Sequence, residues 1–292
     1  MCFSSRKKVL IAWLLVAPVL ILRAFTALYP MAATFFYSLL DYNQIEKTMD
    51  FIGLGNYLAI LQDRTTLETI WFTALFTVSS IALHLVLGIP LALLLNARFA
   101  GRKFVRTIAL IPWAVPMIVA GIAAKWMFNG EYGLINDLLS RAVGVKPDWL
   151  ISIWGARFAV IVTDVWKDTP FMAIMLLAGI QNINGEIYDS ARVDGAGPVT
   201  RLFRITIPLL APVILTLLIF FAIWRFTSFD LVFAMTQGGP GSSTSLLSYR
   251  VYVEAFRNLS FGYSSSIAIV MFVFMCAIGI GGLALHRKMN YV

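Results

Sequence analysis

The sequence predicts an all-α membrane protein with six transmembrane helices. Of its 292 residues, 60% are hydrophobic and 13% are charged, whereas a soluble domain has about 25% charged residues. The apolar residues gather into runs longer than the roughly 18 to 20 residues needed to cross a bilayer. We expect these runs to be helices, because an open strand edge in lipid would leave backbone polar groups without hydrogen bonds.

Six apolar runs define the expected spans. They cover residues 9–30, 69–96, 107–128, 157–180, 209–235 and 263–285. The sequence has no internal repeat, low-complexity linker or extra soluble domain, so residues 1–292 are expected to form a single membrane domain. Short helices are expected in the connections between spans, around FIGLGNYLAIL, at residues 133–142 and at residues 246–256.

Charge asymmetry predicts the orientation in the membrane. With the N-terminus inside, the inner segments carry twelve lysines and arginines, and the much longer outer segments carry seven. The positive-inside rule therefore places both termini and residues 186–208 in the cytoplasm. This bias accounts for the formal net charge of +8, and no RNA- or DNA-binding motif accompanies it.

The N-terminus allows a second interpretation. Arg6, Lys7 and Lys8 precede an apolar run, as in a secretory signal peptide, with residues 24–27 as a poor cleavage site. Removing the first span would leave five spans and put the termini on opposite sides, but it would not invert residues 186–208.

Enzyme chemistry finds little support in the sequence. The two cysteines, Cys2 and Cys276, have no metal-binding spacing, and the two histidines, His84 and His286, fall in the second span and beyond the last. The phosphate-binding pattern G-x-x-x-x-G-K-[ST] is absent. We therefore expect no catalytic residue, no metal site and no cofactor in this chain, and any ATPase must be another polypeptide.

Residues 186–208, EIYDSARVDGAGPVTRLFRITIP, form a charged segment between two apolar runs. The first part has an apolar and a polar side, as a short surface helix would. Gly195 to Pro198 should end this helix, because glycine frees the backbone and proline cannot continue a preceding helix. A second amphipathic helix follows, so the segment predicts two short helices that offer an apolar ridge to a partner.

The spacing in this segment resembles the EAA loop of ABC importer permeases. It reads Asp189-Ser190-Ala191, three residues, Gly195, nine residues and then ITIP; Asp and Ser replace Glu and Ala of the family pattern. In that family the loop is a pair of cytoplasmic helices that dock into the ATPase subunit. The resemblance implies ATPase-docking roles for Glu186, Tyr188, Asp189, Ser190, Ala191, Asp194 and Gly195. The alternative is an ordinary interfacial helix between two spans.

Three further stretches resemble sugar permeases of the maltose-transporter type. They are IPWAVP at 111–116, VWKDTPF at 165–171 and SFDLVFAMTQGGP at 228–240. The GGP sequence after the fifth span resembles the MalF-like member of a heterodimeric permease pair. The likeness implies a trehalose or maltose importer.

Ionisable residues also occur inside the predicted spans, where each costs about 2.5–3.5 kcal/mol on insertion scales unless it faces a cavity or a partner. Asp164, Lys167, Asp168 and Phe171 are spaced i, i+3, i+4 and i+7, so they share one helix face. They could line a polar cavity. Alternatively, Asp164–Lys167 and Asp168–Arg225 could be ion pairs that hold the helices together, and both readings can hold.

Sugar-contacting positions of maltose-type permeases fall on the third, fourth and fifth spans. Matching by motif implies substrate-binding roles for Trp113, Met117, Asp164, Lys167, Asp168, Phe171, Arg225 and Ser228. Such a mixture suits a sugar, whose hydroxyls need donors and acceptors and whose C–H face packs on aromatic rings. His84 is expected to be a packed or hydrogen-bonded histidine rather than a ligand.

Together with the resemblance, the sequence predicts a permease subunit of a binding-protein-dependent sugar ABC importer in the bacterial cytoplasmic membrane, working by alternating access. The implied partners are a second homologous permease, two ATPase subunits that bind ATP and magnesium, and an extracytoplasmic sugar-binding protein; no nucleic acid is expected.

Two other function classes stay open. An ion- or proton-coupled secondary transporter could use Asp164, Asp168 and Asp230 as a relay, but six spans without an inverted repeat argue against it. A membrane enzyme would need a nucleophile–base or metal constellation that the sequence lacks. Co-purification of an ATPase subunit would separate the importer from both.

Overall fold

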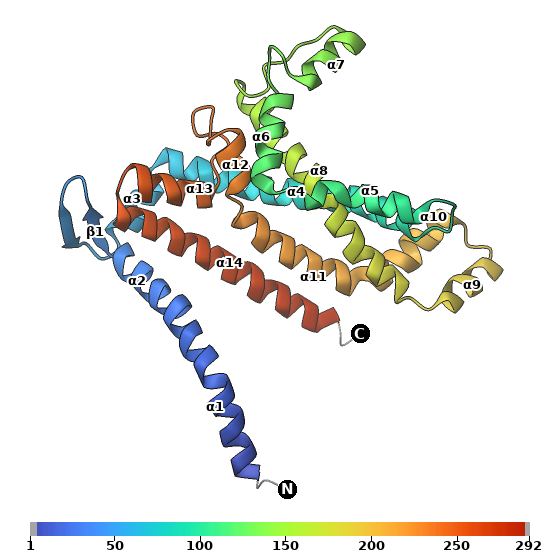
Figure 1. The fold of residues 1–292 in the computed structure, drawn as a ribbon, viewed down its shortest axis with the longest axis horizontal. Helices are drawn as coiled ribbons and strands as arrows, with labels where there is room; N and C mark the ends of the chain where they lie inside the picture. Colours follow the sequence, from blue (N-terminus) through green and yellow to red (C-terminus); the bar gives the residue numbers. More distant parts are fainter. Residues whose placement is uncertain (1–4, 290–292) are drawn as a thin grey trace. The chain divides into compact units, whose positions relative to one another are not determined.

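The computed structural model describes residues 5–289 (Figure 1), so Cys2 lies outside the described residues. In chain order the elements are α1 (Ser5–Arg23), the π-helical turn η1 (Ala24–Leu28), α2 (Tyr29–Ser38), β1 (Leu40–Asn43), β2 (Thr48–Phe51), α3 (Gly55–Gln62), α4 (Arg64–Asn96), α5 (Arg102–Ala114), α6 (Met117–Met127), α7 (Leu134–Val143), α8 (Ile153–Gln181), α9 (Gly185–Val193), α10 (Pro198–Arg201), η2 (Leu202–Thr206), α11 (Ile207–Phe226), α12 (Asp230–Met235), α13 (Leu247–Tyr252), η3 (Val253–Arg257) and α14 (Phe261–Met289).

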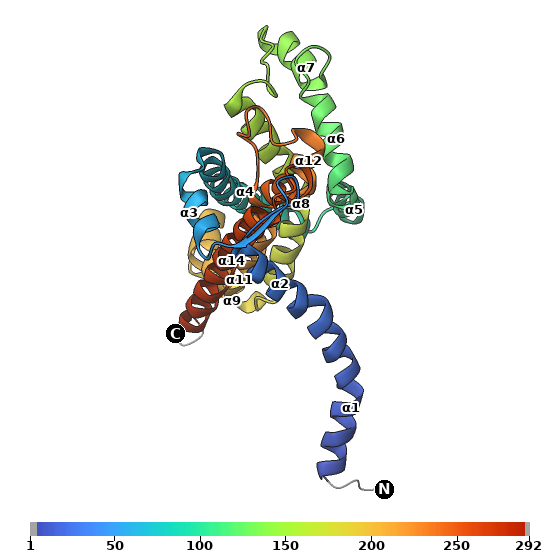
Figure 2. The ribbon, with the colours of Figure 1, turned by 90° about the vertical axis from the view of Figure 1, so that its left-hand side faces the viewer.

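The chain divides into two compact units. The first consists of Met1–Gln62 and Val251–Val270, and the second of Asp63–Arg250 and Met271–Val292. In the first unit, α1, η1 and α2 follow one another as a single helical rod (Figures 1 and 2). The helix thus continues past Pro30, where the sequence predicted the first span to end.

A two-stranded antiparallel hairpin, β1 with β2, corrects the all-α prediction. The strands pair from Leu40 opposite Phe51 to Asn43 opposite Thr48. The turn is held by Asn43, whose Oδ1 accepts hydrogen bonds from the backbone N–H groups of Ile45 and Glu46. Asparagine is suited to this role because its short side chain bonds the backbone two residues on. The LDYN segment gives β1 only four residues, too few for a recognisable alternation of polar and apolar side chains.

The second unit is built on three packed helices, α4, α8 and α11 (Figure 1). Their buried apolar side chains form one cluster: Ala92, Leu95, Met172, Ala173, Leu176, Leu177, Ile180, Leu210, Leu217 and Phe221. Glycines bring the helices close together. A Cβ on Gly88 would lie 2.9 Å from Met172 Cγ, and one on Gly179 would lie 2.8 Å from Leu210 Cδ2. Small residues at contacts are typical of helices that pack inside a membrane.

The third predicted span, 107–128, is not one helix. It is split into α5 and α6, whose axes are bent by 89° at the break. The cause is Pro116: its ring disfavours the helical conformation in the residue before it, and Val115 is accordingly extended, with φ −71° and ψ 130°. Pro116 occupies the N-cap position, immediately before α6.

The fifth predicted span, 209–235, is also interrupted. Helix α11 ends at Phe226, and α12 begins only at Asp230. At the end of α11, Thr227 Oγ1 donates to the backbone carbonyls of Ile223 and Trp224 at 3.2 and 3.0 Å. The sequence prediction missed this break because residues 225–230, RFTSFD, contain polar side chains but no proline or glycine to mark the end of a helix.

Among residues 5–289, four helical stretches are long and apolar enough to cross a membrane: Ala12–Ser38, Arg64–Asn96, Pro198–Phe226 and Phe261–Lys288. The bent pair α5 and α6 makes a fifth if it counts as one span. The predicted fourth span, 157–180, lies within α8 and is helical throughout. It does not join this set, since α8 carries Arg157 and the charges at 164, 167 and 168.

Arg157, near the start of α8, joins three parts of the second unit. Its Nη2 donates to Glu68 Oε1 on α4 at 3.0 Å, and its Nε donates to the backbone carbonyl of Ser243 at 2.9 Å. The guanidinium carbon lies 4.8 Å from the ring centre of Trp71 and 5.1 Å from that of Trp154. Arg157 is buried, so hydrogen bonds and aromatic faces together replace its hydration.

We predict that Arg157→Ala destabilises the protein by about 3 kcal/mol, because it removes one partner of a partly buried ion pair and empties an aromatic cage. The midpoint of thermal unfolding of the purified protein should fall by roughly 5 to 10 °C. Arg141→Ala is the matched control, since Arg141 pairs with Asp137 on the surface of α7 at 3.0 Å, with both side chains mostly exposed. That change should be nearly neutral. Equal shifts for the two variants would contradict this account.

Candidate functional site

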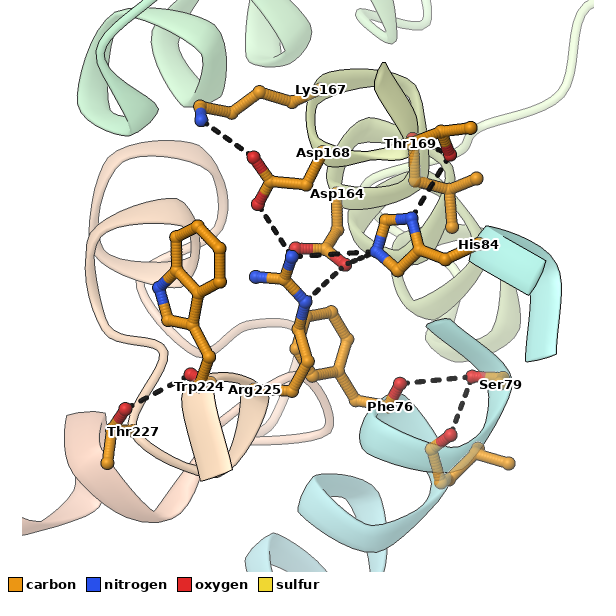
Figure 3. Close-up of polar contacts among 12 residues, drawn as sticks. Phe76, Ser79, His84, Asp164, Lys167, Asp168, Thr169, Trp224, Arg225 and Thr227 are labelled. Atoms are coloured by element: carbon orange, nitrogen blue, oxygen red, sulfur yellow. Dashed lines mark hydrogen bonds and ion pairs between the residues drawn. The ribbon is translucent and has the colours of Figure 1, made fainter. Parts of the chain in front are cut away.

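The charged face of α8 points into the second unit rather than outward. Asp164 and Asp168 are fully buried, and Lys167 is 6% exposed. Their i, i+3, i+4 spacing places them one turn apart on the side of α8 that meets α4 and α11 (Figure 3). Buried charges of this kind need partners, because removing an isolated charge from water is very costly.

Arg225, near the end of α11, is the main partner. Its Nη2 lies 2.6 Å from Asp168 Oδ2, and its Nε lies 3.1 Å from Asp164 Oδ2. Lys167 Nζ lies 2.9 Å from the other oxygen of Asp168. The predicted Asp168–Arg225 pair is therefore present. The predicted Asp164–Lys167 pair is wrong, because Asp164 pairs with Arg225 while Lys167 turns to the neighbouring Asp168.

His84 on α4 completes the cluster (Figure 3). It is fully buried; its Nδ1 lies 3.1 Å from Thr169 Oγ1 and its Nε2 lies 3.3 Å from Asp164 Oδ2. The expectation of a hydrogen-bonded histidine is confirmed. Its place beside the charges could not be read from the sequence, because a lone histidine in an apolar run carries no information about which helix it faces.

Aromatic rings border the cluster. Trp113 at the end of α5 stacks on Phe171 with ring centres 5.4 Å apart, and Phe171 meets Trp224 edge to face at 5.8 Å. The guanidinium carbon of Arg225 lies 5.0 Å from the Trp224 ring centre and 5.4 Å from that of Phe221. Trp113 is 42% exposed, so the stack extends from the buried charges to the surface of the chain.

Of the eight predicted sugar residues, the structure brings six together through the contacts above: Trp113, Asp164, Lys167, Asp168, Phe171 and Arg225. Met117 is half-buried at the first position of α6, just past the break after α5. Ser228 lies in the break between α11 and α12, where its backbone carbonyl accepts a hydrogen bond from Ser248 Oγ. The predicted set includes neither Trp224, which lies against Arg225, nor Thr169, which lies beside His84.

Within residues 5–289, no group of three or more His, Cys, Asp or Glu side chains could hold a metal ion. The cluster contains two carboxylates and two permanent cations, so these four groups balance in charge. Such a site can offer hydrogen-bond donors and acceptors without attracting an ion of either sign.

In the segment 186–208, the first predicted short helix is present as α9, but the second is not separate: α10 and η2 run without a break into α11, so one helical stretch covers Pro198–Phe226. Asn184 caps α9 by accepting a hydrogen bond from the N–H of Glu186 at 3.0 Å. Gly195 has φ +77°, and the N–H of Ala196 donates to the carbonyl of Ala191 at 2.9 Å, an arrangement that ends helices. Positive φ is the reason that glycine is needed here. A Cβ at Gly195 would meet nothing within 4 Å.

Tyr188 ties α9 to the start of α11, because its hydroxyl lies 3.1 Å from Thr206 Oγ1. Large apolar side chains remain exposed around it: Ile187, Val193, Val199 and Phe203. Val193 is 89% exposed. The loop thus presents the apolar ridge that the sequence predicted.

Beside this ridge is a cavity of about 590 Å³, between α9 and the end of α4. It is lined by Leu93, Asn96, Arg98, Ile180, Gly185, Tyr188, Asp189, Arg192 and Thr206. Asp189 and Arg192 pair across its edge at 2.9 Å, with both side chains mostly exposed. Of the seven predicted docking residues, Ala191 is buried and Tyr188 is half-buried; the other five are exposed: Glu186, Asp189, Ser190, Asp194 and Gly195.

Two relatives of known name that the chain resembles over most of its length are both transport system permease proteins. The chain is 41% identical over 271 residues to the sulfoquinovosyl glycerol transport system permease protein SmoG of Agrobacterium fabrum, covering 91% of this chain and 87% of that protein. It is 38% identical over 282 residues to the trehalose/maltose transport system permease protein MalF of Thermococcus litoralis, covering 95% and 94%.

A solved structure shares the fold. A chain of the bacterial alginate ABC transporter, crystallised with a periplasmic protein that holds an alginate pentasaccharide, matches with a TM-score of 0.85 at 22% identity, covering 97% of this chain and 96% of that chain. Residues 84–291 match the family described as binding-protein-dependent transport system inner membrane component. The chain belongs to this family of transport permeases, whose role is passage across the membrane rather than enzymatic catalysis.

Proposed function

We propose that this chain is one of two permease subunits of an ATP-driven importer for an uncharged disaccharide. The observation that carries the proposal is a buried, charge-balanced cluster that adjoins an exposed aromatic stack, in a chain whose relatives are sugar permeases. A sugar offers the matching chemistry: hydroxyls for the polar groups and a C–H face for the rings.

In this proposal the chain crosses the membrane six times, with both termini in the cytoplasm. The spans are α1 with α2, α4, α5 with α6, α8, α11 and α14. Helix α8 carries more charges than an apolar span normally does, but these charges are buried against α4 and α11. Ionisable residues are tolerated in a span when they face other helices rather than lipid. Basic residues at 98–106 and 192–204 then lie on the cytoplasmic side.

The loop from Glu186 to Pro208 is proposed as the docking site for an ATPase subunit, which would bind ATP and magnesium. Its support is the exposed apolar ridge with a cavity beside it, since exposed apolar patches on one side of a protein mark interaction surfaces. A second permease would provide an equivalent loop to a second ATPase. A binding protein outside the membrane would deliver the sugar, as the family description implies.

The sugar path is proposed to run along Trp113, Phe171 and Trp224, with Met117 and Ser228 at the two helix breaks. In this structure Asp164, Asp168 and Arg225 are paired with one another, so a sugar hydroxyl that binds one of the paired atoms must replace an existing contact. The zero sum of charges favours a neutral disaccharide such as trehalose or maltose over a sulfonated sugar. Uptake of trehalose, maltose and sulfoquinovosyl glycerol by the complete complex in vesicles would test this choice.

Docking can be tested at Gly195. Gly195→Asp should uncouple ATP hydrolysis from uptake, because a side chain at φ +77° costs about 1–2 kcal/mol and changes the loop's end. Gly197→Asp is the control: it adds the same carboxylate at φ −68° in open space, where aspartate also caps α10 well. The measurements are sugar-stimulated ATP hydrolysis and uptake in the same vesicles. Normal coupling in Gly195→Asp would rule out the docking role.

The energy source separates the importer from an ion-coupled transporter. Uptake by vesicles that contain the whole complex should require ATP on the side of the membrane where the ATPase subunits lie. It should persist after a protonophore collapses the proton gradient. Loss of uptake at unchanged ATP would instead favour a relay through the buried carboxylates.

The sugar path can be tested at Asp168. Asp168→Ala should lower sugar uptake about tenfold or more, because charge-assisted hydrogen bonds are worth about 1.5–3 kcal/mol and two cations lose a shared partner. The complex should still assemble, since the docking loop is unchanged. Asp137→Ala on the surface of α7 is the control. Failure to assemble would make the cluster structural only, and normal uptake would remove Asp168 from the path.

A further inference from the structure

Two arginines at the start of α5 converge on a single carbonyl at the end of α4. Arg102 Nε donates to the backbone carbonyl of Leu95 at 2.9 Å. Arg106 donates to the same oxygen, with Nε at 3.2 Å and Nη2 at 2.9 Å. Leu95 lies in the last turn of α4, where backbone carbonyls have no helical N–H group to accept from. The two side chains therefore satisfy this carbonyl from the neighbouring helix.

The shared oxygen brings two positive charges together without neutralising them. Each arginine places a nitrogen 2.9 Å from that oxygen, so these nitrogens are separated by no more than the two distances combined. The end of a helix amounts to only about half a negative charge. None of the ion pairs among residues 5–289 includes Arg102, Lys103 or Arg106. Because like charges held this close repel each other, a shared anion between them is favourable.

The bonds to Leu95 leave donors free on both arginines. Arg102 uses only Nε, so its two terminal nitrogens have no hydrogen-bond partner in the part of the chain that the structure describes, and the same holds for Nη1 of Arg106. Lys103 follows Arg102 and is exposed. Guanidinium groups bind phosphate oxygens through two N–H groups at a time. A phosphate group therefore fits the donors that remain.

The same helix continues with an apolar strip, formed by Phe104, Ile108 and Ile111. These positions are spaced i, i+4 and i+7, so they lie along one side of α5. All three side chains are exposed, whereas Val105 and Ala109 pack against the core of the second unit. From its start, α5 thus offers cations first and an exposed apolar strip next, which is the order of a phosphate and an acyl chain in a phospholipid.

We propose that this chain binds an anionic phospholipid at the start of α5, with the phosphate on Arg102 and Arg106 and an acyl chain along the apolar strip. A free phosphate would leave the strip uncovered. In the proposed orientation the start of α5 lies at the cytoplasmic surface, where basic groups between spanning helices bind lipid head groups. Arg98 is not assigned to this site, because it lines the cavity beside the loop proposed for docking.

Native mass spectrometry of the complete complex in detergent measures this binding directly. Phosphatidylglycerol and phosphatidylcholine with identical acyl chains are added in turn, without sugar or ATP. We expect phosphatidylglycerol to bind about tenfold more tightly, because the choline cation neutralises the phosphate in the other lipid and weakens a charge-assisted hydrogen bond. Equal affinity for the two lipids would overturn the proposal.

Paired substitutions separate a defined site from general attraction. Arg102→Gln combined with Arg106→Gln removes both guanidinium groups, and we expect the binding of phosphatidylglycerol to weaken about tenfold or more. The control combines Arg287→Gln with Lys288→Gln, which removes two exposed cations from the last turn of α14. Detergent provides no charged bilayer surface, so this control should bind as the wild type does. Equal losses in the two double variants, or no loss in the first, would contradict a site at α5.

Photocross-linking of the wild-type complex decides the matter even if the first double variant does not assemble. Phosphatidylglycerol with a photoreactive group midway along one acyl chain should label the apolar strip on α5. Excess inorganic phosphate should not remove the label, because the acyl chain contributes to binding. Labelling that misses α5 would mean that a protein partner covers the strip, and would overturn the lipid assignment. Loss of the label in inorganic phosphate would assign the arginines to a free phosphate instead.

The lipid site and the proposed function can fail separately. The inference does not depend on which solute is carried, and neither lipid measurement involves sugar uptake or ATP hydrolysis. A failed lipid test therefore leaves the importer standing, and a failed uptake test leaves the lipid site standing.

Discussion

The arrangement of the second unit depends on the Arg225 guanidinium, which joins α11 to the two carboxylates of α8 in surroundings that exclude water. Apolar contacts between α4, α8 and α11 bring the helices together but do not fix their rotation, because lipid is as apolar as leucine. A buried ion pair with defined geometry does fix it, since any other rotation leaves charges without partners. The aromatic stack adjoins this pair, because Trp224 lies against the Arg225 guanidinium and contacts Phe171.

The two broken spans are placed where such a site needs them. Trp113 and Met117 flank the break between α5 and α6, and Arg225 and Ser228 flank the break between α11 and α12. Inside a membrane, irregular backbone is tolerated only where it is buried in protein or lines a cavity. Broken helices therefore mark positions where backbone and side chains can both meet a polar substrate, as in other transporters.

The sequence was sufficient for the predominance of helices, for the end of α9 and for the shared face of α8, because each depends on local spacing: a turn-forming GAGP, and charges at i, i+3 and i+4. It failed where the outcome depends on neighbours. Lys167 pairs with Asp168, while Asp164 lies against Arg225 of α11 and His84 of α4, and the spacing of charges within α8 says nothing about those two helices. The bend at Val115 could be read from Pro116, whereas no proline or glycine marks the interruption after Phe226.

The loop proposed for docking connects α8 and α11, the two helices that carry the carboxylates and the arginine of the charge cluster. Helix α8 carries Asp164 and Asp168 and ends at Gln181, and three residues separate it from α9. Helix α11 continues from η2 and carries Arg225 near its other end. Tyr188 binds Thr206, so α9 and the start of α11 are linked directly as well as through the chain. In the proposed importer, a displacement of the loop by an ATPase therefore acts on both sides of the Asp168–Arg225 contact at once. Because packed helices move as rigid elements between discrete arrangements, the cluster is the point at which ATP-driven motion can open or close the sugar path.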